Sequence, residues 1–170
     1  MPRPDPRTAL LLRILDQAFD RRAWHGTTLA GSVRGLLADD ALWRPAPRRH
    51  CVWELALHTA YWKYVTRRRL TGSRRGAFPR PRSNWPRLPS VPTEAAWEAD
   101  VALLGEQHRL LREAVASFPV ARLARKPRGG TWTFAEQIAG VAAHDIYHTG
   151  QIQLLKRLRG RGWGQVMGHG

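Results

Sequence analysis

Cysteine is almost absent from this sequence, since Cys51 is the single one among 170 residues. One cysteine excludes an intramolecular disulfide framework and every zinc or iron–sulfur site that needs several cysteines. Long apolar segments are also missing: the run at residues 9–12 ends at Arg13, and no stretch approaches the roughly 20 apolar residues that cross a bilayer. We therefore expect a protein that is neither secreted nor membrane-spanning and that works in a reducing cytoplasm.

Acidic residues are scarce relative to basic ones. The sequence has 28 Lys and Arg against 13 Asp and Glu, a formal net charge of +15, and no carboxylate occurs between Glu54 and Glu94. Such a surface attracts a small anionic substrate, an acidic partner or nucleic acid. Because zinc-finger spacing, RNA-recognition aromatic motifs and a convincing helix-turn-helix are all missing, nucleic acid is the least favoured of these ligands. An arginine-rich coding bias is the alternative explanation of the charge.

The alternation of apolar and polar residues that marks strands is missing too. Apolar residues recur instead at helical spacing, in segments separated by proline and glycine. Asp5 before Pro6 is a helix-start signal, and Thr133 with Glu136 forms a capping box. The segment 73–92 holds five prolines, so we expect an irregular crossover there. Helices are expected at about 6–22, 28–37, 51–70, 93–117 and 133–159.

These segments predict one all-α domain over residues 1–170. With 43% hydrophobic residues, the chain can bury a sizeable core despite its charge. Four long helices and one long connection are typical of a four-helix bundle. In this bundle the Pro/Arg-rich crossover joins the helices at 51–70 and 93–117, and Trp85 is expected to pin the crossover to the bundle.

Three of the seven histidines form a pattern that suggests metal binding. His144 and His148 are four residues apart, which on a helix places them about 40° apart in azimuth and about 6 Å apart along the axis. One metal ion could reach both, and His58, in the middle of the helix at 51–70, is a third candidate. Three neutral imidazoles from two facing helices would hold a divalent ion and leave a position open for water. On the residues alone, a hydrogen-bonded pair and a satisfied core histidine remain the alternatives.

Two longer motifs carry a resemblance to a known family. The segments ELALHTAYWKY, at 54–64, and VAAHDIYHTGQIQLLK, at 141–156, together resemble the DinB-like (YfiT-like) superfamily of metal-binding four-helix bundles. The segment AWHGTTL, at 23–29, resembles one bacterial branch of it. The resemblance implies a divalent-metal site, with zinc or nickel as the usual ion and iron or manganese as alternatives, whose ligands are His58, His144 and His148.

The same resemblance implies a function and an assembly. Some relatives are transferases that use low-molecular-weight thiols, and homodimers are frequent. We therefore expect a metal-dependent enzyme, either a thiol-dependent transferase or a hydrolase, that forms a homodimer. A non-catalytic, stress-related metal-binding bundle is the alternative, and a basic nucleic-acid-binding protein is a weaker one.

Two further residues are candidates for catalysis. Glu54 is four residues before His58, so it could be a fourth ligand, a general base or a group that orients an imidazole. It could equally cap the start of its helix. His25 could reach the bundle opening, or it could have a surface role.

Other candidates surround the histidines. Gln151 and Asp145 are candidates for hydrogen bonds that support the metal ligands rather than for binding the ion, and a solvated side chain is the alternative for Gln151. The candidates for substrate binding are Tyr61, Trp62 and Arg67, and an arginine there would favour an anionic substrate.

Overall fold

The computed structural model describes residues 5–73 and 76–160, and within these ranges it contains helices and no strand. The all-α prediction is therefore confirmed. The elements are α1 (Pro6–Phe19), α2 (Leu29–Val33), α3 (Ala38–Leu42), α4 (Val52–Thr71), α5 (Glu94–Ala116), the short 3-10 helix η1 (Val120–Arg122) and α6 (Phe134–Leu158).

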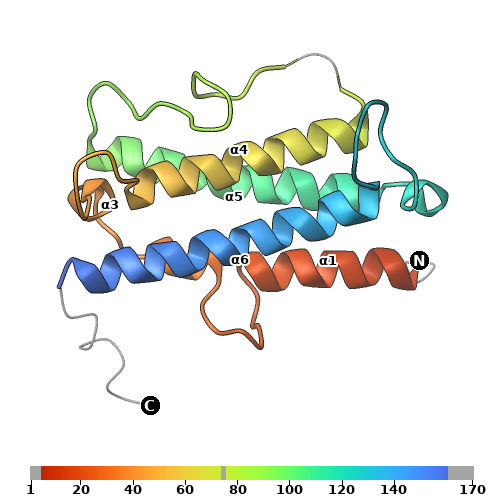
Figure 1. Ribbon diagram of the computed structural model, residues 1–170, viewed down its shortest axis with the longest axis horizontal. Helices are drawn as coiled ribbons and strands as arrows, with labels where there is room; N and C mark the ends of the chain where they lie inside the picture. The colour runs from red at the N-terminus through yellow and green to blue at the C-terminus, as the bar shows by residue number, and fades with distance from the viewer. Residues whose placement is uncertain (1–4, 74–75, 161–170) are drawn as a thin grey trace.

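The four long helices α1, α4, α5 and α6 form the predicted bundle (Figure 1). In Figure 1, α1 and α6 run in one direction, whereas α4 and α5 run in the other. The chain leaves the end of α4, crosses back along the whole bundle and then enters α5, which makes α4 and α5 parallel neighbours. The long crossover thus has the place that the sequence predicts.

The helices begin and end at local sequence signals. The predicted capping box at the start of α6 is present: the amide of Thr133 donates to Glu136 Oε2 over 2.6 Å, and the amide of Glu136 donates to Thr133 Oγ1 over 3.2 Å. At the end of α4, Gly72 has φ +68°, a left-handed conformation that glycine adopts without the steric cost of a Cβ. Local sequence therefore fixes one end of each histidine-bearing helix.

The helix expected at 28–37 is wrong in its extent, because only the short helix α2 lies in this region and α3 begins after it, at Ala38. Arg34 is extended and Gly35 has φ +69°, so the helix stops there. The apolar spacing that suggested one helix has another cause: Leu29, Val33 and Leu36 all enter the same core cluster. The first helix also ends at Phe19 rather than near 22, and residues 20–22 are exposed.

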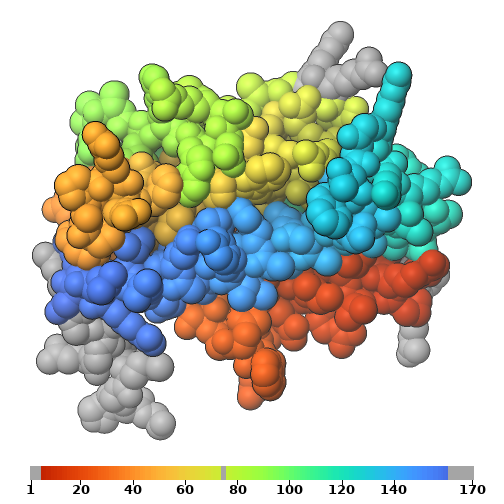
Figure 2. All heavy atoms as spheres, in the orientation of Figure 1, coloured from red at the N-terminus to blue at the C-terminus, as the bar shows by residue number. Residues whose placement is uncertain are grey.

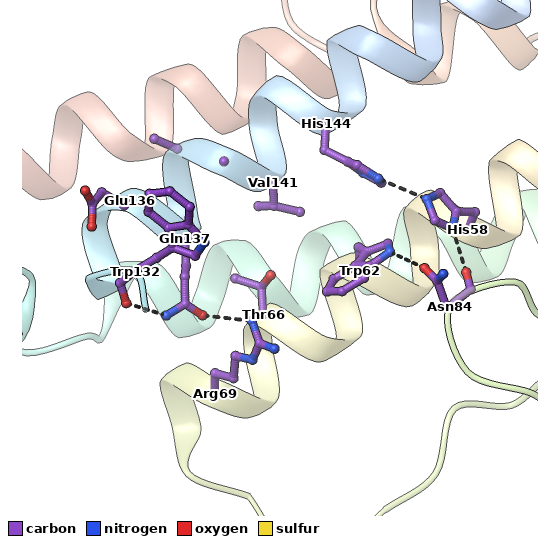
Figure 3. Close-up of a pocket in the computed structure, with 12 residues that line it drawn as sticks. His58, Trp62, Thr66, Arg69, Asn84, Trp132, Glu136, Gln137, Val141 and His144 are labelled. Carbon is purple, nitrogen blue, oxygen red and sulfur yellow. Dashed lines mark hydrogen bonds between the residues drawn. The ribbon is translucent and has the colours of Figure 1, made fainter. Parts of the chain in front are cut away.

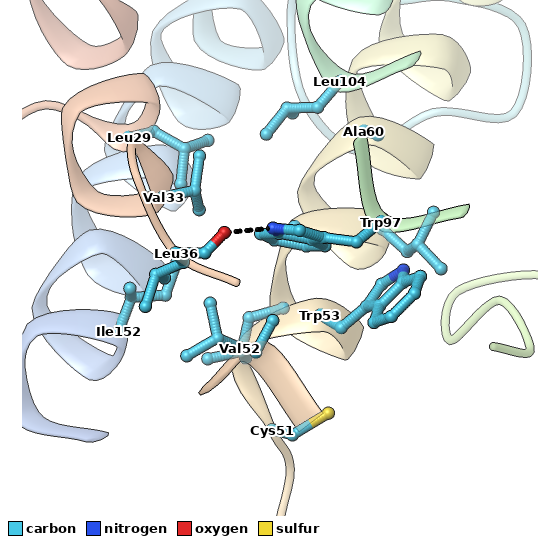
Figure 4. Packing of buried hydrophobic residues seen from close by; sticks show 14 of the residues in the cluster. Leu29, Val33, Leu36, Cys51, Val52, Trp53, Ala60, Trp97, Leu104 and Ile152 are labelled. Carbon is cyan, nitrogen blue, oxygen red and sulfur yellow. Dashed lines mark hydrogen bonds between the residues drawn. The ribbon is translucent and has the colours of Figure 1, made fainter. Parts of the chain in front are cut away.

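The core at the α2 and α3 end of the bundle is built around two tryptophans (Figure 4). Trp97 Nε1 donates to the carbonyl oxygen of Leu36 over 2.7 Å, and Trp53 Nε1 donates to Asp100 Oδ2 over 2.8 Å. Buried indoles usually find such a partner. The second oxygen of Asp100 accepts from Arg80 Nε over 2.8 Å, which ties the crossover to α5.

None of the helices in the described ranges combines the length and the apolar character that a membrane span requires.

Candidate metal centre

The structure brings His58, on α4, together with His144 and His148, on α6. Their ligand nitrogens all lie within 4.8 Å of one another. Nε2 of His144 is 3.0 Å from Nε2 of His58 and 3.0 Å from Nε2 of His148. His58 and His148 are buried, and His144 is half-buried. Three imidazoles from two facing helices therefore meet at one point inside the bundle.

Hydrogen bonds on the far side of two rings decide which nitrogen carries the proton. Nδ1 of His58 donates to the carbonyl oxygen of Asn84, and Nδ1 of His148 donates to Gln151 Oε1, each over 2.6 Å. A neutral imidazole has one proton, so Nε2 of both rings presents a lone pair to the centre of the cluster. A proton on His144 Nε2 can satisfy only one of these two lone pairs.

His144 completes a donor set that suits a metal ion better than a hydrogen-bond network. Its Nδ1 is buried and has no hydrogen-bond partner among the residues that the structure describes. As a purely hydrogen-bonded group the cluster leaves polar atoms unsatisfied, which is costly inside a protein. Three imidazole nitrogens directed at one point are instead a typical ligand set for a divalent ion. The residues present therefore fit the metal that the sequence predicts.

Burial keeps these rings neutral. It lowers the pKa of His58 to about 4 and that of His144 to about 3, and it also lowers the pKa of His148. An imidazole must be unprotonated to bind a metal ion. All three histidines are thus in the ligand form near neutral pH.

The crossover covers His58 (Figure 3). Asn84, whose carbonyl oxygen binds His58, has φ +62°, a left-handed conformation that asparagine tolerates better than most residues. Its side-chain Oδ1 accepts from Trp62 Nε1 over 2.9 Å. The next residue, Trp85, stacks on His58 and on His50, with ring centroids 3.9 and 3.7 Å apart. Trp85 therefore joins the crossover to α4, whereas no sequence motif pointed to Asn84 or His50.

Two cavities meet at the histidines, because His58 and His144 line both. The first, of about 730 Å³, lies between α4 and α6 and is called here the α4–α6 cavity. The second, of about 590 Å³, is bordered by Trp85 and is called here the Trp85 cavity. His148 and Gln151 line only the Trp85 cavity. In Figure 2 the crossover lies above α4 and reaches down to α6.

The two catalytic candidates lie apart from the histidine cluster. Glu54 faces the start of α4, where its Oε2 accepts from the amide of Cys51 over 3.1 Å and its carboxylate pairs with Arg44 at 2.6 and 2.8 Å. Neither cavity is lined by Glu54, so its role in the structure is to cap the helix. His25 is exposed in the turn between α1 and α2 and lines neither cavity.

Of the two residues expected to support the metal ligands, Gln151 contacts a histidine and Asp145 does not. Gln151 contacts His148 directly, as the hydrogen bond to Nδ1 shows. Asp145 is fully buried, and its carboxylate pairs with Lys63 rather than with a histidine. Asp145 therefore links α6 to α4 beside the cluster instead of orienting a ligand.

The substrate-binding candidates lie on different faces of α4. Trp62 lines the α4–α6 cavity. Tyr61 packs against Phe78, and the Arg67 guanidinium lies over the ring of Tyr64 at 5.6 Å, so neither lines a cavity at the histidines. The arginines at the two cavities are instead Arg69 and Arg49.

A family model described as the DinB superfamily matches residues 21–152, a range that contains all three histidines. No curated protein and no solved structure matches the chain.

Proposed function

The chain belongs to the DinB superfamily, and from this premise we propose that it binds a divalent metal ion through His58, His144 and His148. The observation that carries the proposal is the pair of Nδ1 hydrogen bonds that turns two Nε2 lone pairs toward His144. Zinc and nickel suit a set of imidazole ligands best, while manganese prefers oxygen ligands.

We further propose that the protein is a metal-dependent enzyme, either a transferase that uses a low-molecular-weight thiol or a hydrolase. An ion held by three protein ligands supplies Lewis-acid chemistry or activates a bound water or thiol. The chain itself would supply the binding site around the ion. Both cavities have the size of small-molecule sites, and the tryptophans at 62 and 85 shield the histidines from water. The competing proposal is a non-catalytic bundle in which the ion only ties α4 to α6. Turnover of any compound in a panel of thiols and esters would support the enzyme over the non-catalytic bundle.

Metal analysis of protein purified without a nickel column tests the first proposal. We expect about one divalent ion per chain in the wild type and loss of the ion from His148→Ala. His25→Ala is the matched control, since His25 is exposed and remote from the cluster, and it should retain the ion. A wild-type protein without stoichiometric metal, or a His148→Ala variant that holds it undiminished, would contradict the proposal.

Gln151→Leu is expected to weaken metal affinity by about 10- to 100-fold, the usual cost of losing a partner that orients a ligand. The reason is that Nδ1 of His148 loses its acceptor, so the ring is no longer held with its Nε2 lone pair inward. A competition titration against a chromophoric zinc chelator measures the change. Gln153→Leu is the control, because Gln153 lies on the same helix but lines neither cavity. Equal affinities in the two variants would show that Gln151 does not orient the ligand.

A further inference from the structure

The α4–α6 cavity extends far beyond the histidines. On α4, Arg69 comes eleven residues after His58, which is close to three helical turns, so both face the same side about 16 Å apart along the axis. On α6, Gln137 comes seven residues before His144, close to two turns, and about 10 Å from it along the axis. Figure 3 shows the two histidines at one end of this cavity and Arg69 with Gln137 at the other.

The wall between the two ends is largely apolar. Trp62 and Val141 line it, and the indole nitrogen of Trp62 is already bonded to Asn84. Gly140 also lines it, and a Cβ built there would meet nothing within 4 Å. An elongated apolar molecule therefore finds room and matching surface along this stretch.

At the end of the cavity away from the histidines, Arg69 carries a positive charge and has N–H donors that an anion could use. Arg69 Nη1 donates to Gln137 Oε1 over 3.2 Å, and Gln137 Nε2 donates to the carbonyl oxygen of Trp132 over 3.0 Å, which holds the guanidinium at the cavity end. Among the residues that the structure describes, no carboxylate forms an ion pair with Arg69. Glu136 also lines the cavity, but its carboxylate accepts from the amide of Thr133. Arg69 thus keeps donors that match a planar carboxylate.

We propose that the α4–α6 cavity binds an elongated, largely apolar carboxylate, whose acid group pairs with Arg69 and whose other end reaches His58 and His144. If the ligand is a substrate that reacts at the histidine end, that part of the proposal rests on the proposed function. Binding at the Arg69 end does not, because no metal ligand takes part in it. The net charge of +15 attracts an anion of this kind to the protein.

Calorimetry on metal-stripped protein tests the proposal with octanoate, octanol and butanoate as probes. Octanoate is expected to bind up to about fivefold more tightly than octanol, because Arg69 is exposed and an exposed ion pair contributes up to about 1 kcal/mol. Octanoate should also bind more tightly than butanoate, which has the same acid group but a short apolar chain. Arg69→Gln should abolish the advantage of octanoate over octanol. Arg49→Gln, which removes the same charge from the Trp85 cavity, should preserve it.

A steric variant tests the location without removing a charge. Gly140→Leu fills open space in the cavity wall and should weaken octanoate and octanol alike. Gly150→Leu, on the same helix where a Cβ also meets nothing, lines neither cavity and should weaken neither. Equal binding of octanoate and octanol to the wild type, or equal effects of Arg69→Gln and Arg49→Gln, would overturn the proposal.

The two proposals can fail separately. His148 lines only the Trp85 cavity, so His148→Ala should lose the metal ion and still bind octanoate. If the protein binds octanoate but never holds metal, the carboxylate site is supported and the metal-dependent function is contradicted. If it holds stoichiometric metal but does not prefer octanoate to octanol, the metal site is supported and the carboxylate site is contradicted.

Discussion

Removing the divalent ion with a chelator is expected to lower the unfolding temperature by about 8–16 °C. An ion that binds only the folded state stabilises it by about 4 kcal/mol when its concentration is 1,000 times the dissociation constant. For a chain of this length, each kcal/mol shifts the unfolding temperature by about 2–4 °C. The three ligands come from α4 and α6, so the ion would also link these two helices. Differential scanning calorimetry of metal-loaded and chelator-treated protein measures it.

Two controls isolate the ion as the cause. His144→Ala should unfold at the same temperature with and without chelator. The pH dependence separates two effects: the pKa of His58 is lowered to about 4 and that of His144 to about 3 in the folded chain, whereas the unfolded chain binds protons near 6.5. Between these values the unfolded state binds more protons, so both samples should lose stability as the pH falls from 6.5 toward 4, while the difference between them should persist until the folded histidines protonate near pH 4. A chelator effect that is absent at neutral pH would contradict the metal site.

Helical periodicity places the residues of this site correctly, even where the residue selected from the sequence was wrong. Arg67 was expected at the cavity, but nine residues after His58 amount to two and a half turns, which places Arg67 on the opposite side of α4. Eleven residues bring Arg69 to the same side, where the structure has it. The i, i+4 pair at 144 and 148 follows from the same arithmetic. Contacts within one helix were therefore predictable from the sequence alone.

Contacts made by the crossover were predictable only in part. The prediction that Trp85 pins the crossover to the bundle is confirmed by its stacking on His58. The individual partners could not be predicted, because Asn84 and Trp85 belong to a segment without helical or strand periodicity and meet His58 across 26 or more residues. The segment at 28–37 shows the converse case: its apolar residues are spaced as in a helix, but Gly35 adopts a positive φ and the chain turns. Backbone conformation in irregular segments depends on the tertiary packing, which the pattern of apolar residues does not encode.

Asp145→Ala is expected to destabilise the protein by about 3–5 kcal/mol, which corresponds to a fall in unfolding temperature of about 6–20 °C. Lys63 and Asp145 are both 0% exposed, and Asp145 is the only ion-pair partner of Lys63 among the described residues. Without it, the Lys63 ammonium faces the ring of Phe19 at 5.0 Å and His108. Burial and the Lys63 charge lower the pKa of His108 to about 3, so that ring is neutral and cannot replace the carboxylate.

Glu113→Ala is the matched control for this measurement. It breaks the exposed pair between Glu113 and Arg109 and should leave the unfolding temperature nearly unchanged, because exposed ion pairs contribute little. Thermal and urea unfolding of the two variants provide the comparison. Similar stabilities for Asp145→Ala and Glu113→Ala would mean that Lys63 reaches water when its partner is lost.

The double variant Lys63→Met/Asp145→Leu separates the stability of the fold from the geometry of the site. Replacing a buried ion pair by apolar residues of similar volume is often neutral or stabilising, so the double variant should recover most of the stability that Asp145→Ala loses. Asp145 directly follows His144, and Lys63 lies on the helix of His58, so the pair joins the two helices whose histidines must meet. If the pair sets their register, the double variant will be stable but will bind metal more weakly than the wild type. Wild-type metal affinity in this variant would show that apolar packing alone aligns the histidines.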